Sequence, residues 1–189
     1  LKSNTTGVQN TAVGSLALDA NTTGLNNVGV GFNVLSNNTT GSFNVAMGVN
    51  AALAVTGNSG NTAIGSLALE DNTANNNTAV GYGTAKQNTS GSEFVAMGYG
   101  ALDANTTGSS SVAIGYEALS ANTTGDTNTA LGHKSLLSNT TASNNTAVGA
   151  SSLRNTTTGQ QNVAVGKNAL KENTTGPNNV AVGDRALES

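Results

Sequence analysis

The sequence stands out first for the residue types that it lacks. Its 189 residues include no cysteine, no tryptophan, one proline and one histidine, and only 9% of them are charged. An average chain is about 25% charged. The absence of cysteine excludes disulfides, thiolate catalysis and cysteine-based metal sites. Aromatic residues make up only 3% of the chain, which argues against an ordinary globular core and favours a repetitive fold with small interior side chains.

The charge and hydropathy of the chain exclude two further classes. A net charge of −3 without a basic cluster leaves no electrostatic footprint for nucleic acid. No run of about 18 apolar residues occurs, so we expect no direct membrane insertion by this segment. A single proline and few charges are also unlike a disordered chain. Because Leu1 falls partway through a repeat, we expect the chain to be an excerpt of a longer one.

What the chain has instead is a tandem repeat of 17 residues, with the consensus N-[TV]-A-[VIML]-G-x-x-A-L-x-x-N-T-T-G-x-x. The coils start at residues 10, 27, 44, 61, 77, 94, 111, 128, 145, 162 and 179. Residues 1–9 are the tail of an earlier coil, the fourth coil is one residue shorter, and the last is truncated. We therefore predict one domain, 1–189, an all-β solenoid with one coil per repeat.

Each position of the repeat carries its own residue type. Position 2 is always Thr or Val, position 4 is always aliphatic and position 5 is always Gly, which predicts a short strand that ends at the glycine. A glycine at this position of every coil indicates either a positive φ or a close approach of another backbone segment. We expect the β-branched residues of position 2, the aliphatic residues of position 4 and the leucines of position 9 to fill the interior. Equivalent residues of successive coils stack about 4.8 Å apart, so the Asn and Thr residues of positions 1 and 12 to 14 are expected to form ladders.

Positions 3 and 6 are the candidates for contact with partners. All charged residues fall at positions 6, 7, 10, 11, 16 or 17, which marks those positions as solvent-facing. Position 3 lies on the opposite strand face from positions 2 and 4 and never carries a charge, so we predict that it packs against identical chains. The predicted oligomer interface consists of Ala12, Gly29, Ala46, Ala63, Ala79, Ala96, Ala113, Ala130, Ala147, Ala164 and Ala181. Position 6 carries a row of aromatic residues, Phe32, Tyr82, Tyr99 and Tyr116, which we regard as a candidate contact for a ligand or a partner.

The segment Asn162-Val163-Ala164-Val165-Gly166, followed by Ala169, resembles the head repeats of YadA-like trimeric autotransporter adhesins. The likeness extends over all eleven coils. It implies a left-handed parallel β-roll, a close-packed homotrimer and an outer-membrane anchor outside this segment. The 17-residue period is longer than in those heads and is similar to repeats of bacterial surface proteins and phage tail fibres.

Three functions remain open at this point. The resemblance favours a structural or adhesive segment of an extracellular fibre, located at the cell surface, that binds itself and a surface protein or glycan. A phage tail-fibre segment on a virion is the alternative with the same fold. An ice-binding solenoid is the alternative of another class, although its surface requires Thr-x-Thr and the threonines here are adjacent. We expect no enzyme, cofactor or metal, because His133 stands alone and stacked coils offer no convergent triad.

Overall fold

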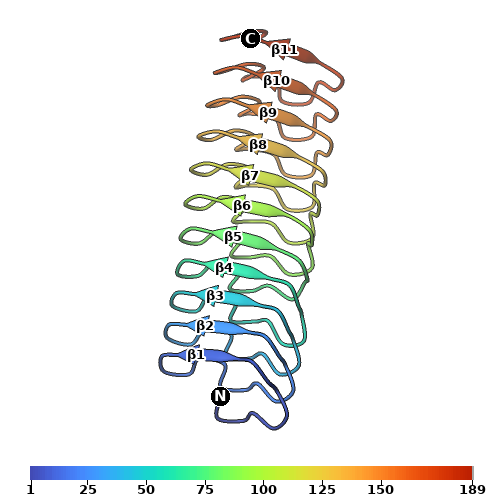
Figure 1. The fold of residues 1–189 in the computed structure, drawn as a ribbon. Helices are drawn as coiled ribbons and strands as arrows, with labels where there is room; N and C mark the ends of the chain where they lie inside the picture. Colours follow the sequence, from blue (N-terminus) through green and yellow to red (C-terminus); the bar gives the residue numbers. More distant parts are fainter. Residues whose placement is uncertain (189) are drawn as a thin grey trace.

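The computed structural model describes residues 1–188 and consists of a single stack of coils around one parallel sheet of eleven strands (Figure 1). Each coil contributes one strand of three residues and closes through turns before the next strand begins. The strands are β1 (Thr11–Val13), β2 (Val28–Val30), β3 (Val45–Met47), β4 (Thr62–Ile64), β5 (Thr78–Val80), β6 (Val95–Met97), β7 (Val112–Ile114), β8 (Thr129–Leu131), β9 (Thr146–Val148), β10 (Val163–Val165) and β11 (Val180–Val182).

The register of the sheet follows the repeat. Each strand pairs in parallel with the strands of the preceding and following coils, in sequence order from β1 to β11. Residues at the same position of the repeat are partners, as Thr11 and Val28 are. The shorter fourth coil keeps this register, because Thr62 still pairs with Thr78. The predicted parallel solenoid with 17-residue coils is therefore confirmed.

The two faces of each strand are the reverse of what the sequence led us to expect. The middle residue of the strand, position 3, is buried in ten of the eleven strands and half-buried in β1. The residues of positions 2 and 4 were predicted to be interior, but none of them is buried, and Val13 is 56% exposed. The prediction that positions 2 and 4 form the core is wrong.

The narrowness of the coil explains this reversal. Inside the coil, position 3 lies directly against the residues of positions 8 and 9. A Cβ at Gly29 would already lie 3.3 Å from Cγ1 of Val34 and 3.4 Å from Cγ of Leu18. Because Val34 is larger than the Ala found at most other copies of position 8, glycine compensates for it at position 3. Interior space, and not the hydrophobicity of the side chain, selects Ala at this position.

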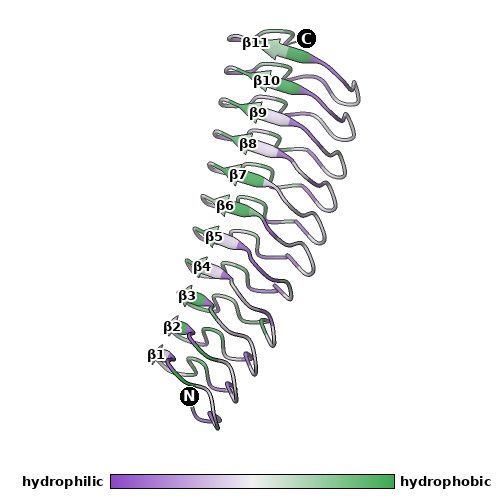
Figure 2. Cartoon of the chain, turned by 45° about the vertical axis from the view of Figure 1, so that its right-hand side comes forward, coloured by the Kyte–Doolittle hydropathy of each residue, from purple (hydrophilic) through white to green (hydrophobic). Residues whose placement is uncertain are grey.

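The apolar half of the interior is formed by positions 3, 8 and 9. The leucines of position 9 were predicted to point inward, and those from Leu18 to Leu153 are fully buried. They belong to one continuous cluster that also contains the alanines of positions 3 and 8. Figure 2 also shows that the hydropathy of the strands alternates along the stack: β6 and β7 are green, whereas β4, β5, β8 and β9 are pale.

Four positions of the repeat, 5, 7, 9 and 17, have positive φ. The position-5 glycines all have φ between 119° and 139°, which is one of the two alternatives that the sequence indicated. Most residues at the other three positions are not glycine, as shown by Leu67 (62°) and Leu102 (57°). A bulky residue in the left-handed region is uncommon, and here the stacking of coils maintains it. This feature was not anticipated from the sequence.

Buried asparagines fill the other half of the interior. The amide of Asn122 is typical of position 12: its Nδ2 donates to Oδ1 of Asn105 (2.9 Å), and its Oδ1 accepts from Nδ2 of Asn139 (2.8 Å). Position 1 behaves differently, because Nδ2 of Asn145 donates across its own coil to the carbonyl of Gly159 (2.9 Å). The predicted asparagine ladder is confirmed at position 12. The threonine hydroxyls of position 13 instead donate to backbone carbonyls of the next coil.

The position-12 ladder is interrupted twice. Val55 and Thr156 stand where other coils have asparagine, and neither side chain donates to the coil before it. The Oδ1 atoms of Asn38 and Asn139, which precede these two residues, are accordingly buried without a hydrogen-bond partner. Each interruption leaves one acceptor unsatisfied, at a cost of about 1–3 kcal/mol.

We expect the substitution Thr156→Asn to stabilise the protein by about 1 kcal/mol. The new amide would donate to Oδ1 of Asn139, and this gain outweighs the loss of the Thr156 hydroxyl bond to the carbonyl of Asn173 (2.8 Å). The measurement is the midpoint of guanidinium unfolding. Thr157→Asn, one residue further along and outside the ladder, is the control. A midpoint of Thr156→Asn at or below that of the wild type would contradict the prediction.

Candidate functional site

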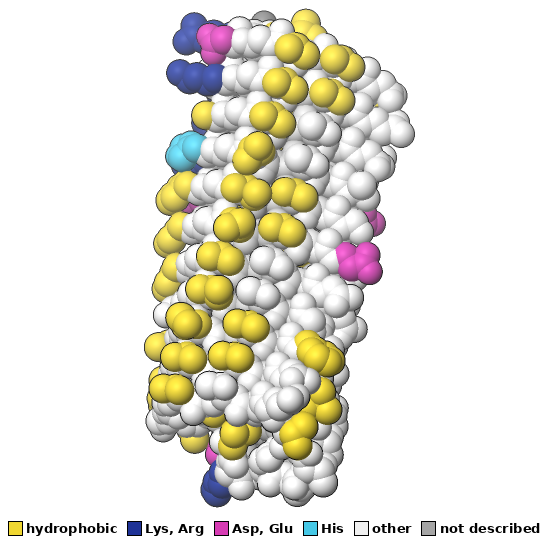
Figure 3. Space-filling model, viewed as in Figure 1, with side chains coloured by type: hydrophobic (Ala, Val, Ile, Leu, Met, Phe, Trp, Pro, Cys, Tyr) yellow, Lys and Arg dark blue, Asp and Glu magenta, His cyan; other side chains and the backbone are white. Residues whose placement is uncertain are grey.

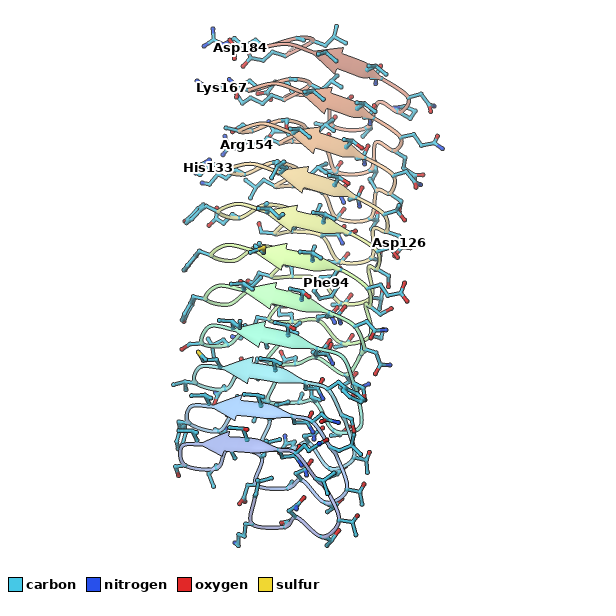
Figure 4. The ribbon with its side chains drawn as sticks, in the orientation of Figure 1. Phe94, Asp126, His133, Arg154, Lys167 and Asp184 are labelled. Carbon is cyan, nitrogen blue, oxygen red and sulfur yellow. The ribbon has the colours of Figure 1, made fainter. Side chains whose placement is uncertain are left out.

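The charged corners of the coils are on the outside, as predicted. No Lys, Arg, Asp or Glu side chain of residues 1–188 is buried. In Figure 4, His133, Lys167 and Asp184 project at the turn that follows the strand, whereas Asp126 projects at the opposite side of the coil. Several charges pair between successive coils, for example Lys86 with Glu70 (3.6 Å).

The outer face of the sheet is the largest uniform surface. Its two columns are positions 2 and 4 of the eleven strands, and they contain only Thr, Val, Ile, Leu and Met. Figure 3 shows these side chains running along the length of the solenoid, over the strands. The more exposed of them are Val13, Val45, Met47, Ile64, Val95, Met97, Leu131, Val165, Val180 and Val182. We call this surface the strand face.

The strand face is free of charge although it is exposed. The strip is about 50 Å long and about 7 Å wide, or on the order of 350 Å², from the spacing of strands and residues in a sheet. The largest apolar patch of a typical monomer is about 300–600 Å² and is often functional, so a strip of this size is a candidate interaction surface. Among the exposed columns, the strand face shares the lack of charge only with the turn of positions 13 and 14, and there the exposed residues are mostly threonines such as Thr107 and Thr124. The strand face is the uncharged column that consists largely of aliphatic side chains.

The predicted interface residues do not lie on this face. Ala12, Gly29, Ala46, Ala63, Ala79, Ala96, Ala113, Ala130, Ala147, Ala164 and Ala181 point into the coil, where all but Ala12 are buried. An alanine enclosed by its own coil has no surface with which to contact another chain. These residues are small because the interior of the coil is narrow, and not because another chain packs against them. The prediction of an oligomer interface at position 3 is therefore wrong.

The aromatic residues of position 6 form a stacked ladder. The rings of Tyr82 and Tyr99 are 5.6 Å apart and nearly parallel, and those of Tyr99 and Tyr116 are 5.4 Å apart. The ladder continues to His133, whose ring lies 5.4 Å from that of Tyr116. His133 was expected to be an isolated surface residue, although it occupies the same position of the repeat as Tyr116 in the preceding coil. Phe32 is three coils away from the ladder.

Stacking leaves few ring faces free. Within the ladder the rings cover one another, so Tyr99 and Tyr116 present mainly their edges to solvent. Tyr82 is the first ring, and the preceding coil has Ser66 at the same position. One face of Tyr82 therefore has no ring against it. Of the three tyrosines, Tyr82 is the one with an open ring face.

A hollow of about 170 Å³ adjoins the first two rings of the ladder. It is lined by Leu67, Tyr82, Gly83, Lys86, Tyr99, Gly100 and Asp103. The two glycines occupy position 7, where the other coils have side chains. A larger hollow, of about 370 Å³, lies over the last coils around Leu170 and Asn173. In earlier coils the residues equivalent to Leu170 and Asn173 are buried beneath the following coil.

Two charged side chains border the smaller hollow. Burial raises the pKa of the Asp103 carboxyl, and the nearby Lys86 opposes this shift. Oδ1 of Asp103 is buried without a hydrogen-bond partner. The ammonium of Lys86 is already paired with Glu70. At the far end of the ladder, a hydrogen bond from Tyr116 to Glu117, together with the charge of that carboxylate, raises the pKa of the Tyr116 phenol.

Within residues 1–188, no three His, Asp or Glu side chains lie close enough to share a metal ion. No helix that is both long and apolar enough to span a bilayer is present in that part of the chain. Comparison of the chain with protein-family models, with curated proteins and with solved structures finds no match in any of the three. The function therefore has to be argued from the strand face and the aromatic ladder.

Proposed function

We propose that this chain is a structural and adhesive segment of an extracellular fibre, in which identical solenoids associate through their strand faces. The observation that carries the proposal is the strand face itself, which is uncharged in all eleven coils, carries an aliphatic residue at position 4 of each, and is exposed or half-buried along its whole length. A second copy of the chain is the partner that fits it best. Its strands have the same spacing of about 4.8 Å, so each strand of one copy can lie opposite the equivalent strand of the other along the whole solenoid.

The pattern of position 2 supports association in register. Along the stack the residues are Thr11, then two valines, two threonines, two valines, two threonines and two valines. Identical chains aligned side by side place threonine next to threonine, where hydroxyls can bond to each other, and valine next to valine. A displacement of two coils would place each threonine pair beside a valine pair. The banding therefore disfavours a displacement of one, two or three coils. A displacement of four coils would match the bands again, but it would leave four coils of each chain unpaired.

The number of chains and the winding of the coil rest on the resemblance to YadA-like head repeats. It implies three chains, each a left-handed β-roll, in the head or shaft of a surface adhesin whose anchor lies outside this segment. A phage tail fibre would use the same face in the same way. The ice-binding alternative has less support, because each outward threonine of position 2 is followed at position 4 by an aliphatic residue.

We expect Ile114→Asp to dissociate the oligomer and to leave the solenoid folded. Ile114 lies on the strand face and is half-buried within one chain. In a trimer, three carboxylates would meet in an apolar interface, at a cost of several kcal/mol. The measurements are light scattering at micromolar concentration, for the mass, and circular dichroism, for the strand content. The wild type should have the mass of a trimer and the variant that of a monomer.

Gln160→Asp is the matched control. It adds the same charge at an exposed corner of the coil, away from the strand face, and should leave the mass unchanged. A monomeric wild type, or an Ile114→Asp variant that assembles normally, would refute association through this face.

A further inference from the structure

We propose that the hollow beside Tyr82 and Tyr99 is a binding site for a neutral sugar unit. Such a site would give the proposed adhesive fibre a ligand, and in this respect alone it rests on the proposed function. Four observations support it: the glycines that open the hollow, the free ring face, the unpartnered carboxylate and the local charge.

The glycines of the hollow are not required by the backbone. Gly83 has a φ of 61° and Gly100 a φ of 58°, but other residues adopt the same conformation at the same position, among them Leu16 at 60° and Leu67 at 62°. Steric crowding does not require them either. A Cβ at Gly83 would meet no atom within 4 Å, and one at Gly100 would come no closer than 3.8 Å to Glu117. Glycine at position 7 of two successive coils leaves the space of the hollow open.

The walls of that space match the two-sided chemistry of a sugar. A pyranose has an apolar C–H face and a rim of hydroxyl groups. Tyr82, which has one uncovered ring face, and Leu67 line the hollow on its apolar side. Aromatic faces attract C–H groups because their π-electron density is negative. At about 170 Å³ the hollow is smaller than the 300–1,000 Å³ of sites for drug-sized ligands, so it suits one ring of a longer chain.

On the polar side of the hollow, the Asp103 carboxylate and the Lys86 ammonium can form further hydrogen bonds. Asp103 leaves one carboxylate oxygen without a donor, and a buried acceptor of this kind gains by pairing with a hydroxyl. Rotation about χ2 of Asp, which is a soft torsion, can turn either oxygen toward a ligand. The ammonium of Lys86 has three protons and a single ion-pair partner, Glu70, so it can also donate to a ligand oxygen.

Charge selects a neutral ligand over an acidic one. The groups at this side of the ladder are two carboxylates, Glu70 and Asp103, and one ammonium, Lys86. A uronic or sialic acid would bring a further negative charge to a site that already has an excess of one. We therefore expect hexoses and N-acetylhexosamines to bind and acidic sugars to bind more weakly.

The chain itself provides the signal for a titration. Its only tyrosines are the three of the ladder, and it has no tryptophan, so ultraviolet fluorescence reports on the ladder alone. The probes are glucose, galactose, mannose, N-acetylglucosamine and their disaccharides, with glucuronic acid as the acidic comparison. We expect a saturable fluorescence change with a dissociation constant in the millimolar range, as for small ligands at shallow sites. Saturation-transfer NMR should show the same sugars in contact with the protein.

Gly83→Leu tests the site. The leucine would stack on Leu67 in a conformation that the repeat already accommodates and would fill the hollow, so we expect at least a tenfold loss of affinity with unchanged stability. Asp103→Asn should weaken binding about tenfold, since hydrogen bonds to charged groups contribute about 1.5–3 kcal/mol. Ser151→Leu places the same side chain at position 7 four coils away, in a backbone with φ of 58°, and should bind like the wild type.

The outcomes separate this inference from the proposed function. Failure of all these sugars to bind the wild type at 50 mM, or equal binding by Gly83→Leu and the wild type, would overturn the sugar site. Neither result affects the mass of the oligomer, which depends on the strand face. Conversely, sugar binding by a monomeric protein would support the site and refute the assembly.

Discussion

Replacing Ala113 by glutamate is expected to unfold the central coils of the solenoid. Ala113 is the middle residue of β7 and is fully buried inside the coil. The glutamate is larger than the available space, and overpacking alone costs about 1–3 kcal/mol. Its carboxylate would also be buried without a partner, which adds several kcal/mol. We expect a loss of strand signal in circular dichroism that includes at least the coils of β6, β7 and β8, because each coil depends on its neighbours.

The neighbouring substitution Ile114→Glu provides the control. It introduces the same side chain one residue later, on the strand face, and should leave the fold of the single chain intact. The contrast between the two variants tests the orientation of the strand directly. If Ala113→Glu folded normally and only dissociated the oligomer, position 3 would have to point outward, as the sequence analysis supposed.

Gly115→Val is the second substitution with a large expected effect. Gly115 has a φ of 138°, a conformation that costs a residue with a side chain about 1–3 kcal/mol. A Cβ there would also lie 2.5 Å from the carbonyl oxygen of Gly132 and 2.7 Å from its carbonyl carbon. Both atoms belong to the backbone of the next coil and cannot move aside without separating the stack. We expect a destabilisation of more than about 3 kcal/mol, measured by guanidinium unfolding.

Gly100→Ala is the matched control for this prediction. Gly100 also has a positive φ, 58°, but its Cβ would be 3.8 Å from the nearest side-chain atom and would meet no backbone. The substitution should change the stability by less than about 1 kcal/mol. Equal losses for Gly100→Ala and Gly115→Val would mean that close approach of the coils is not the reason for glycine at position 5.

The candidate site was only partly predictable from the sequence. The row of tyrosines followed from their common position in consecutive coils, and the same argument applied to His133 would have extended the ladder. The hollow was not predicted, because Gly83 and Gly100 look like ordinary glycines of a glycine-rich repeat. Only the backbone conformation of their equivalents, such as Leu67, shows that glycine is dispensable there.

By itself, the sequence determined the length of the coil, the register of the strands, the charged corners and the need for glycine at the position of Gly115 and its equivalents. These follow from periodicity, since a residue type held at one position of every repeat reflects a local requirement that each coil shares. The sequence also showed that the two faces of the strand differ, but not which of them is inside. In a wide core the larger side chain of Ile114 would be buried, whereas this coil is so narrow that Ala113 and asparagine fill it. Only the tertiary structure decided the orientation, because the space between the strand and the opposite turn depends on how the whole coil closes.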